Sequence, residues 1–127
     1  MRLSLLAFFV CFGSVAHAQT TPSLYSKQFQ SCLDKSGGGS GSYDCMSKEM
    51  AIQDKKLNDA YKKLTASITP ERKKLLLTAQ RTWINFRDSN CAFHVDPDGG
   101  QIGQQAGPVC ELEYTALRAK ELLMLSN

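Results

Sequence analysis

The sequence predicts an all-α protein, a small helical bundle of three to four helices with two disulfides. Apolar residues recur at helical spacing along most of the chain, and no segment shows the alternation of apolar and polar residues that a half-buried strand requires. Four cysteines follow an N-terminal segment that has the features of an export signal. An even number of cysteines in a small exported chain is typical of disulfides.

Residues 1–18 have the features of a signal peptide. Arg2 gives the positive charge, Leu3 to Val15 form an apolar stretch, and the end of the segment, AHA, is the small-x-small pattern that signal peptidase cleaves. No apolar stretch in the chain reaches the roughly 20 residues of a membrane span, so we expect no membrane insertion. Cleavage near Ala18 leaves residues 19–127 as one domain, located in the periplasm or secreted.

The first half of the mature chain predicts two helices separated by a glycine-rich loop. Apolar residues at helical spacing indicate a short helix over 24–35. Residues 36–42, with the sequence SGGGSGS, are flexible by composition and predict a loop. Asp44 is a suitable N-cap for a second helix, whose 3.6-residue period continues to Ile68.

The second half predicts two further helices and a long connection. Thr69 and Pro70 match the preferred N-cap and first helical position of a third helix, which is expected to reach Cys91. Residues 92–109 contain four glycines and two prolines, so we expect a long loop. A last helix is expected over 110–125.

Four cysteines permit three disulfide connectivities, and sequence alone does not choose among them. We favour Cys32–Cys45 and Cys91–Cys110, because each of these pairs brackets a segment rich in helix breakers. The loop-entropy model gives each disulfide roughly 3 kcal/mol of stabilisation.

Charge is distributed unevenly along the chain. Residues 55–74 carry a net charge of +5, whereas residues 88–113 carry −5 and contain no lysine or arginine. Two solvated surfaces of different sign would give this pattern, and so would an acidic face that attracts a basic partner.

Two predicted helices carry polar residues on their apolar faces. We expect Asp54 and Arg87 to pair across the helices, because a buried carboxylate needs a cationic partner. Asn58, Tyr61 and Gln80 would satisfy the remaining donors and acceptors of this buried polar network. We interpret the network as one that fixes helix register rather than as a catalytic carboxylate with an arginine clamp, since no nucleophile stands beside it.

Other function classes find little support. His94 is the one histidine of the mature chain, no serine lies in a G-x-S-x-G motif, and we therefore expect no enzymatic activity. Cys91, His94 and Cys110 would suit zinc, but export favours disulfides, so neither a metal nor another cofactor is expected. The basic segment lacks interleaved aromatic residues, so no nucleic-acid partner is expected.

Three motifs together resemble the LprI-type lysozyme-inhibitor family. The first is D-x-x-L-N-x-x-Y-x-x-L, which starts at Asp54, and the second is Q-x-x-W-x-x-x-R-D-x-x-C, which starts at Gln80. The third is the C-terminal end, where Cys110 is followed by Leu112, Thr115 and Arg118. The resemblance extends from about Cys32 to Leu123 and implies a helical domain of the cell envelope with two disulfides.

The resemblance implies a protein partner, since some members of the family inhibit lysozyme. C-type lysozymes are basic enzymes whose cleft works through two carboxylates, so an acidic loop closed by a disulfide would fit the cleft. The partner-binding residues that we expect are Asp96, Asp98, His94 and Glu111. An alternative is a periplasmic immunity or envelope-stress factor that binds a different hydrolase or toxin.

Overall fold

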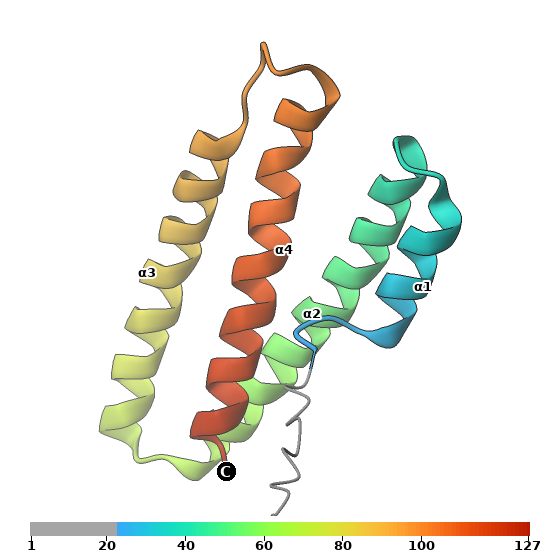
Figure 1. The fold of residues 1–127 in the computed structure, drawn as a ribbon. Helices are drawn as coiled ribbons and strands as arrows, with labels where there is room; N and C mark the ends of the chain where they lie inside the picture. The colour runs from blue at the N-terminus through green and yellow to red at the C-terminus, as the bar shows by residue number, and fades with distance from the viewer. Residues whose placement is uncertain (1–22) are drawn as a thin grey trace, which may run out of the picture.

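The structure is a computed structural model that describes residues 23–127; the predicted signal peptide and its cleavage site lie outside the described residues. The described residues form four helices and no strand: α1 (Lys27–Ser36), α2 (Ser40–Ser67), α3 (Pro70–His94) and α4 (Gly100–Leu125) (Figure 1). Disulfides join Cys32 to Cys45 and Cys91 to Cys110, which confirms the all-α class and the favoured pairing.

The helices are arranged as an open row rather than a closed ring. Neighbours in space follow the order α3, α4, α2, α1, because α3 packs on α4, α4 on α2, and α2 on α1 (Figure 1). The helices α2 and α4 run in the same direction, and α3 returns the chain between them. No helix within residues 23–127 is both long and apolar enough to cross a membrane.

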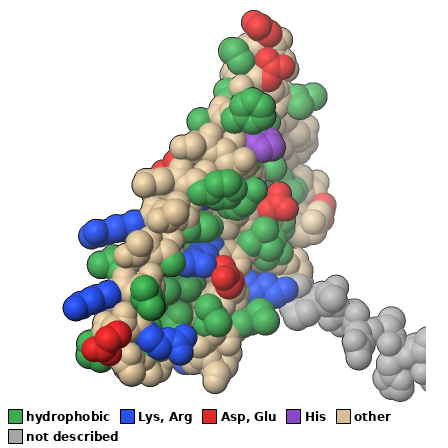
Figure 2. Space-filling model, turned by 90° about the vertical axis from the view of Figure 1, so that its left-hand side faces the viewer, with side chains coloured by type: hydrophobic (Ala, Val, Ile, Leu, Met, Phe, Trp, Pro, Cys, Tyr) green, Lys and Arg blue, Asp and Glu red, His purple; other side chains and the backbone are tan. Residues whose placement is uncertain are grey.

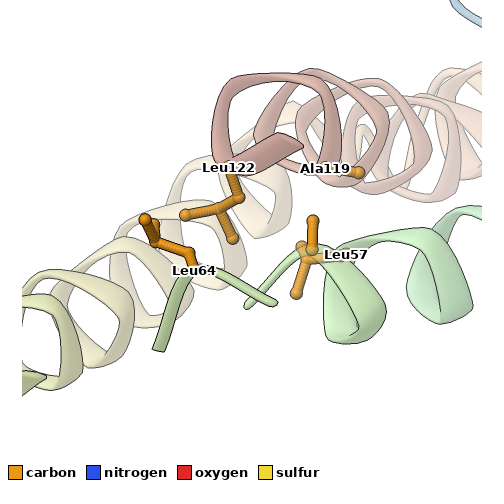
Figure 3. Packing of buried hydrophobic residues seen from close by; sticks show 5 residues of the cluster. Leu57, Leu64, Ala119 and Leu122 are labelled. Carbon is orange, nitrogen blue, oxygen red and sulfur yellow. The ribbon is translucent and has the colours of Figure 1, made fainter. Parts of the chain in front are cut away.

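The hydrophobic core lies mainly between α2 and α4. Leu57 and Leu64 of α2 meet Ala119 and Leu122 of α4 (Figure 3). The 3.6-residue period places such residues on one stripe of each helix, and burial of that stripe provides most of the stability of an amphipathic helix. From α3, Leu76 and Trp83 pack against this cluster, and both are partly buried.

The expected start of α3 is confirmed. Thr69 has extended backbone angles, its hydroxyl accepts a hydrogen bond from the backbone nitrogen of Arg72, and Pro70 occupies the first helical position. Asp44, in contrast, does not cap α2, because that helix begins at Ser40. The predicted loop 36–42 shortens to three glycines, Gly37–Gly39, which all have the positive φ that glycine tolerates.

The predicted long loop over residues 92–109 is wrong. The helix α3 continues to His94 and α4 starts at Gly100, so that only residues 95–99 connect them. Three of the four glycines of this segment, Gly99, Gly103 and Gly107, serve close packing: a Cβ on Gly107 would lie 2.6 Å from Cγ2 of Val95. The cost of glycine within a helix, about 1 kcal/mol each, is thus offset by tertiary contact.

Candidate partner-binding site

The connection between α3 and α4, residues 95–99, is a tight turn held by its own backbone. The backbone nitrogen of Asp96 donates to the Gly103 carbonyl at 3.2 Å, and that of Gly99 donates to the Asp96 carbonyl at 3.2 Å. The backbone nitrogen of Asp98 donates to Oδ1 of Asp96 at 3.0 Å, as in an Asx turn. These bonds fix the direction in which the turn presents its side chains. We call residues 93–102 the acidic tip.

The acidic tip stands at one end of an electrically asymmetric molecule. The carboxylates of Asp96 and Asp98 are exposed, and residues 88–113 around them contain no lysine or arginine. On the face that carries α3, the top shows acidic side chains and no lysine or arginine, whereas the lower part shows lysine and arginine side chains with further acidic ones among them (Figure 2). The acids and the absence of cations in residues 88–113 make the electrostatic potential around the tip negative.

Apolar side chains accompany the acids at the tip. Phe93 is 86% exposed and Ile102 is 84% exposed, and both lie within two helical turns of the aspartates. Figure 2 shows that hydrophobic side chains continue down this face below the acidic top. Exposed apolar side chains that gather in one region often mark an interaction site, whereas isolated ones are common on any protein surface.

A shallow groove of about 460 Å³ runs down α4 from the tip. Its lining includes His94, Val109, Glu113, Tyr114 and Leu117. The ring of Tyr114 packs edge to face on that of Phe86, with centroids 5.6 Å apart, so α3 contributes the neighbouring surface. The groove therefore combines an imidazole, a carboxylate and aromatic surface beside the acidic tip.

The structure brings three of the four predicted partner-binding residues to one end of the molecule. Asp96 and Asp98 lie in the turn, and His94 is the last residue of α3. Glu111 is half-buried on α4, roughly 16 Å along the axis from the helix start at 1.5 Å per residue. Glu113, which sequence analysis did not select, lines the groove with His94. Their role in binding stays a prediction.

The predicted pair of Asp54 and Arg87 is wrong. Asp54 is exposed on α2, and Arg87 instead donates to the neighbouring Asp88 and to the hydroxyl of Thr115 on α4. The row of helices explains the difference, because α4 lies between α2 and the part of α3 that carries Arg87. Asn58 is also exposed, and its side-chain nitrogen donates to the Asp54 carbonyl on its own helix.

A different polar cluster joins α3 to α4. Gln80 is buried, and its carbonyl oxygen accepts a hydrogen bond from Nε of Arg118 at 3.0 Å. The guanidinium groups of Arg87 and Arg118 lie 5.2 and 5.8 Å from the centroid of the Trp83 ring, within cation–π range. Tyr61 belongs to the edge of the hydrophobic core rather than to this cluster.

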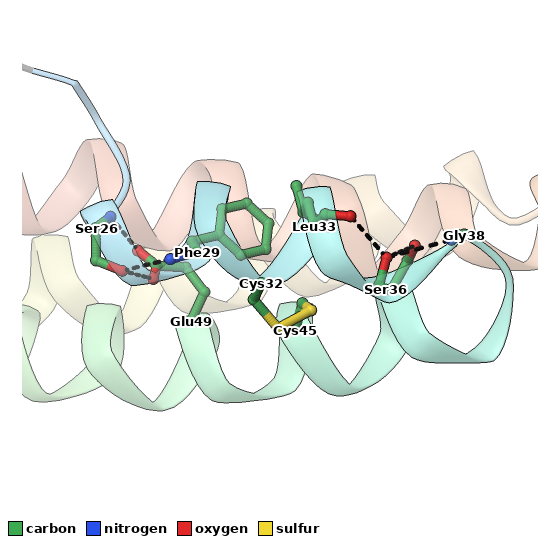
Figure 4. Close-up of a disulfide and its surroundings, with 9 residues drawn as sticks. Ser26, Phe29, Cys32, Leu33, Ser36, Gly38, Cys45 and Glu49 are labelled. Atoms are coloured by element: carbon green, nitrogen blue, oxygen red, sulfur yellow. Dashed lines mark hydrogen bonds between the residues drawn. A yellow bond between two sulfur atoms is a disulfide. The ribbon is translucent and has the colours of Figure 1, made fainter.

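Each disulfide ties one helix to the next along the chain. Cys91 and Cys110, both buried, join the last turns of α3 to α4 below the acidic tip, with Cα atoms 5.4 Å apart. Cys32 and Cys45 join α1 to α2 (Figure 4). Because the Cys91 and Cys110 sulfurs bond to each other, they form no thiolate zinc site with His94.

Most of the described chain matches a known protein family. The model of the family described as lysozyme inhibitor LprI matches residues 32–122. This chain belongs to the LprI lysozyme inhibitor family. The LprI match includes the four disulfide-bonded cysteines, the acidic tip and the groove. Searches of curated proteins and of solved structures found no match.

The structure gives a role to several residues of the three LprI motifs. The motif residues Gln80, Trp83 and Arg118 form the cluster that joins α3 to α4. The motif residues Leu57 and Leu64 belong to the core between α2 and α4. The LprI motifs therefore hold the helices that support the tip, whereas the acids of the tip lie between two motifs.

Proposed function

We propose that this LprI protein is exported and inhibits a c-type lysozyme by placing its acidic tip against the lysozyme cleft. Family membership supports inhibition by protein binding rather than catalysis. The observation that carries the proposal is the tight turn at residues 95–99, which presents Asp96 and Asp98 between the exposed Phe93 and Ile102.

Charge complementarity is the first part of the argument. C-type lysozymes are strongly basic, so a segment of net charge −5 is attracted over several ångströms and enters contact in a preferred orientation. Such steering raises the association rate more than the final affinity, and salt weakens it. The affinity must therefore come from buried contacts as well.

The exposed side chains Phe93 and Ile102 supply those contacts. Aromatic anchors near the centre of an interface dominate binding energy in many complexes. The turn is ordered by backbone hydrogen bonds and by the Cys91–Cys110 disulfide, so little conformational entropy is lost when it binds. An exposed acidic surface with apolar anchors on a rigid support is a suitable inhibitor surface.

The test is inhibition of a c-type lysozyme by the oxidised protein and by a charge variant. Asp96→Asn/Asp98→Asn retains the oxygen that accepts the bond from the Asp98 backbone nitrogen and removes two charges. The control Asp54→Asn/Glu71→Gln removes the same charge from exposed sites elsewhere. We expect the tip variant to inhibit at least about tenfold more weakly, because each charged contact is worth about 1.5 kcal/mol or more.

A second pair of variants tests the apolar contribution. Phe93→Ser is expected to weaken inhibition, whereas Leu75→Ser, at a residue 71% exposed near the opposite end of α3, is expected to leave it unchanged. Equal inhibition by the parent and both tip variants would reject the tip as the contact surface. No inhibition by the parent protein at high micromolar concentration would reject c-type lysozyme as the target.

A further inference from the structure

A second cavity lies away from the acidic tip, on the side of the core between α2 and α4. It measures about 590 Å³, within the range of about 300–1,000 Å³ that is typical of small-molecule sites. Leu24, from the segment before α1, closes one edge. Leu123 and Met124, which are 50% and 68% exposed, form part of its wall on α4.

Small residues on the facing helices create this space. Ala60 of α2 and both Ala116 and Ala119 of α4 line the floor and are buried. A leucine at such positions would fill the volume, as Leu57, Leu64 and Leu122 do in the neighbouring core. The cavity is therefore a continuation of the core that residues 23–127 leave open on one side.

The rim of the cavity is cationic. Lys56 and Lys63, two helical turns apart on α2, and Lys120 on α4 line the opening. The carboxylate at the rim, Asp59, is engaged by Lys55 at 2.6 Å, and that lysine holds the pKa of Asp59 below its usual value. Lys63 bonds to the neutral amide oxygen of Asn127 at 2.6 Å, and no carboxylate of the described residues forms an ion pair with it.

We infer that this cavity binds a long-chain fatty acid, with its hydrocarbon on the alanine floor and its carboxylate at the lysine rim. Apolar surface that is open to water favours a hydrocarbon. Three ammonium groups around the opening favour an anionic head, because a charge-assisted hydrogen bond is about twice as strong as a neutral one. The inference concerns a site separate from the acidic tip and does not depend on the proposed inhibition.

The experiment is a calorimetric titration of the delipidated protein with a monomeric long-chain fatty acid, beside the alcohol of equal chain length. We expect one fatty acid per chain and weaker binding of the alcohol. Lys56→Gln/Lys63→Gln/Lys120→Gln is expected to weaken fatty-acid binding at least about tenfold. The control Lys48→Gln/Lys73→Gln/Lys74→Gln removes equal charge from exposed sites outside the cavity and is expected to bind as the parent does.

A variant of the apolar wall completes the test. Met124→Glu places a negative charge on an exposed wall residue, is compatible with the fold for that reason, and is expected to abolish binding. Equal affinity for the acid and the alcohol, or equal losses in both lysine triplets, would overturn the inference. A delipidated protein that is dimeric and dissociates under Met124→Glu would also overturn it, since a second copy would then cover the cavity.

Discussion

The carboxylate of Glu49 accepts hydrogen bonds from both the backbone nitrogen and the hydroxyl of Ser26, the N-cap of α1 (Figure 4). Glu49 is 1% exposed, and Nε2 of Gln53 donates to it at 2.6 Å. The Ser26 hydroxyl in turn accepts a bond from the backbone nitrogen of Phe29. A buried carboxylate on α2 therefore organises the first turn of α1.

Replacement of Glu49 by alanine is expected to lower the free energy of unfolding by about 2–3 kcal/mol, because the half-buried donors of Ser26 and the buried amide of Gln53 lose their acceptor. The measurement is urea unfolding followed by circular dichroism. The control Asp54→Ala removes an exposed carboxylate from the same helix and is expected to change stability by less than about 0.5 kcal/mol. Similar losses in the two variants would contradict this role of Glu49.

Replacement of Arg118 by methionine is expected to cost about 1–3 kcal/mol, because it leaves the buried Gln80 oxygen without its donor and removes a cation from Trp83. Trp83 is the single tryptophan of the chain, so its fluorescence reports the unfolding of this contact. Arg81→Met, at an exposed position of α3, is the matched control. A stable Arg118→Met protein with unchanged Trp83 emission would show that the cluster does not hold α3.

Replacement of Gly103 by alanine is expected to disturb the acidic tip, because the new Cβ would overlap the carbonyl oxygen of Asp96. We expect a loss of about 1–3 kcal/mol, the usual cost of overpacking. Hydrogen exchange of the Gly99 amide, which bonds to that carbonyl, is expected to accelerate. Gln104→Ala changes the next, exposed residue and is expected to leave exchange unchanged. Slow exchange in both variants would refute the packing argument.

Alkaline pH is expected to destabilise the protein partly through Tyr25. Burial raises the pKa of the Tyr25 phenol above its usual value of 10.0, and the carboxylates of Glu113 and Glu49 raise it further. The folded state thus holds this proton more tightly than the unfolded chain does. The stabilisation is complete below pH 10 and is lost as pH rises through the folded pKa.

The melting temperature between pH 9 and about pH 11.5 measures this effect. The comparison is between the parent and Tyr25→Phe, because the two proteins differ only in the Tyr25 phenol. The variant has no phenol to ionise and is expected to lose less stability over this range. Parallel curves for the two proteins would contradict the expectation.

The sequence predicts the parts of the fold that depend on local chemistry. Thr69 and Pro70 start α3 as expected, since capping depends on residues within one turn. The pairing of Cys91 with Cys110 is also as expected, although the reason differs. The bond joins two helices that continue past it, and does not close a loop.

The incorrect predictions concern features that depend on contacts between helices. Glycines at 99–107 indicate a loop when their neighbours are unknown, but in the fold they allow α4 to approach Asp96 and Val95. The partner of Arg87 depends on which helix lies beside α3, and helical period does not give that order. Sequence analysis does not identify Phe93 and Ile102 as binding residues. Their exposure depends on the ends of α3 and α4, where the sequence predicts a loop.

The parallel course of α2 and α4 has a consequence for how the chain folds. Leu57 and Ala119, which meet in the core, are about sixty residues apart, so loop closure across all of α3 must precede core formation. The disulfides span 13 and 19 residues and staple two hairpins, α1–α2 and α3–α4, without linking one to the other. Each disulfide therefore constrains one hairpin only, and we expect the two hairpins to dock late in folding through the alanine and leucine residues of α2 and α4.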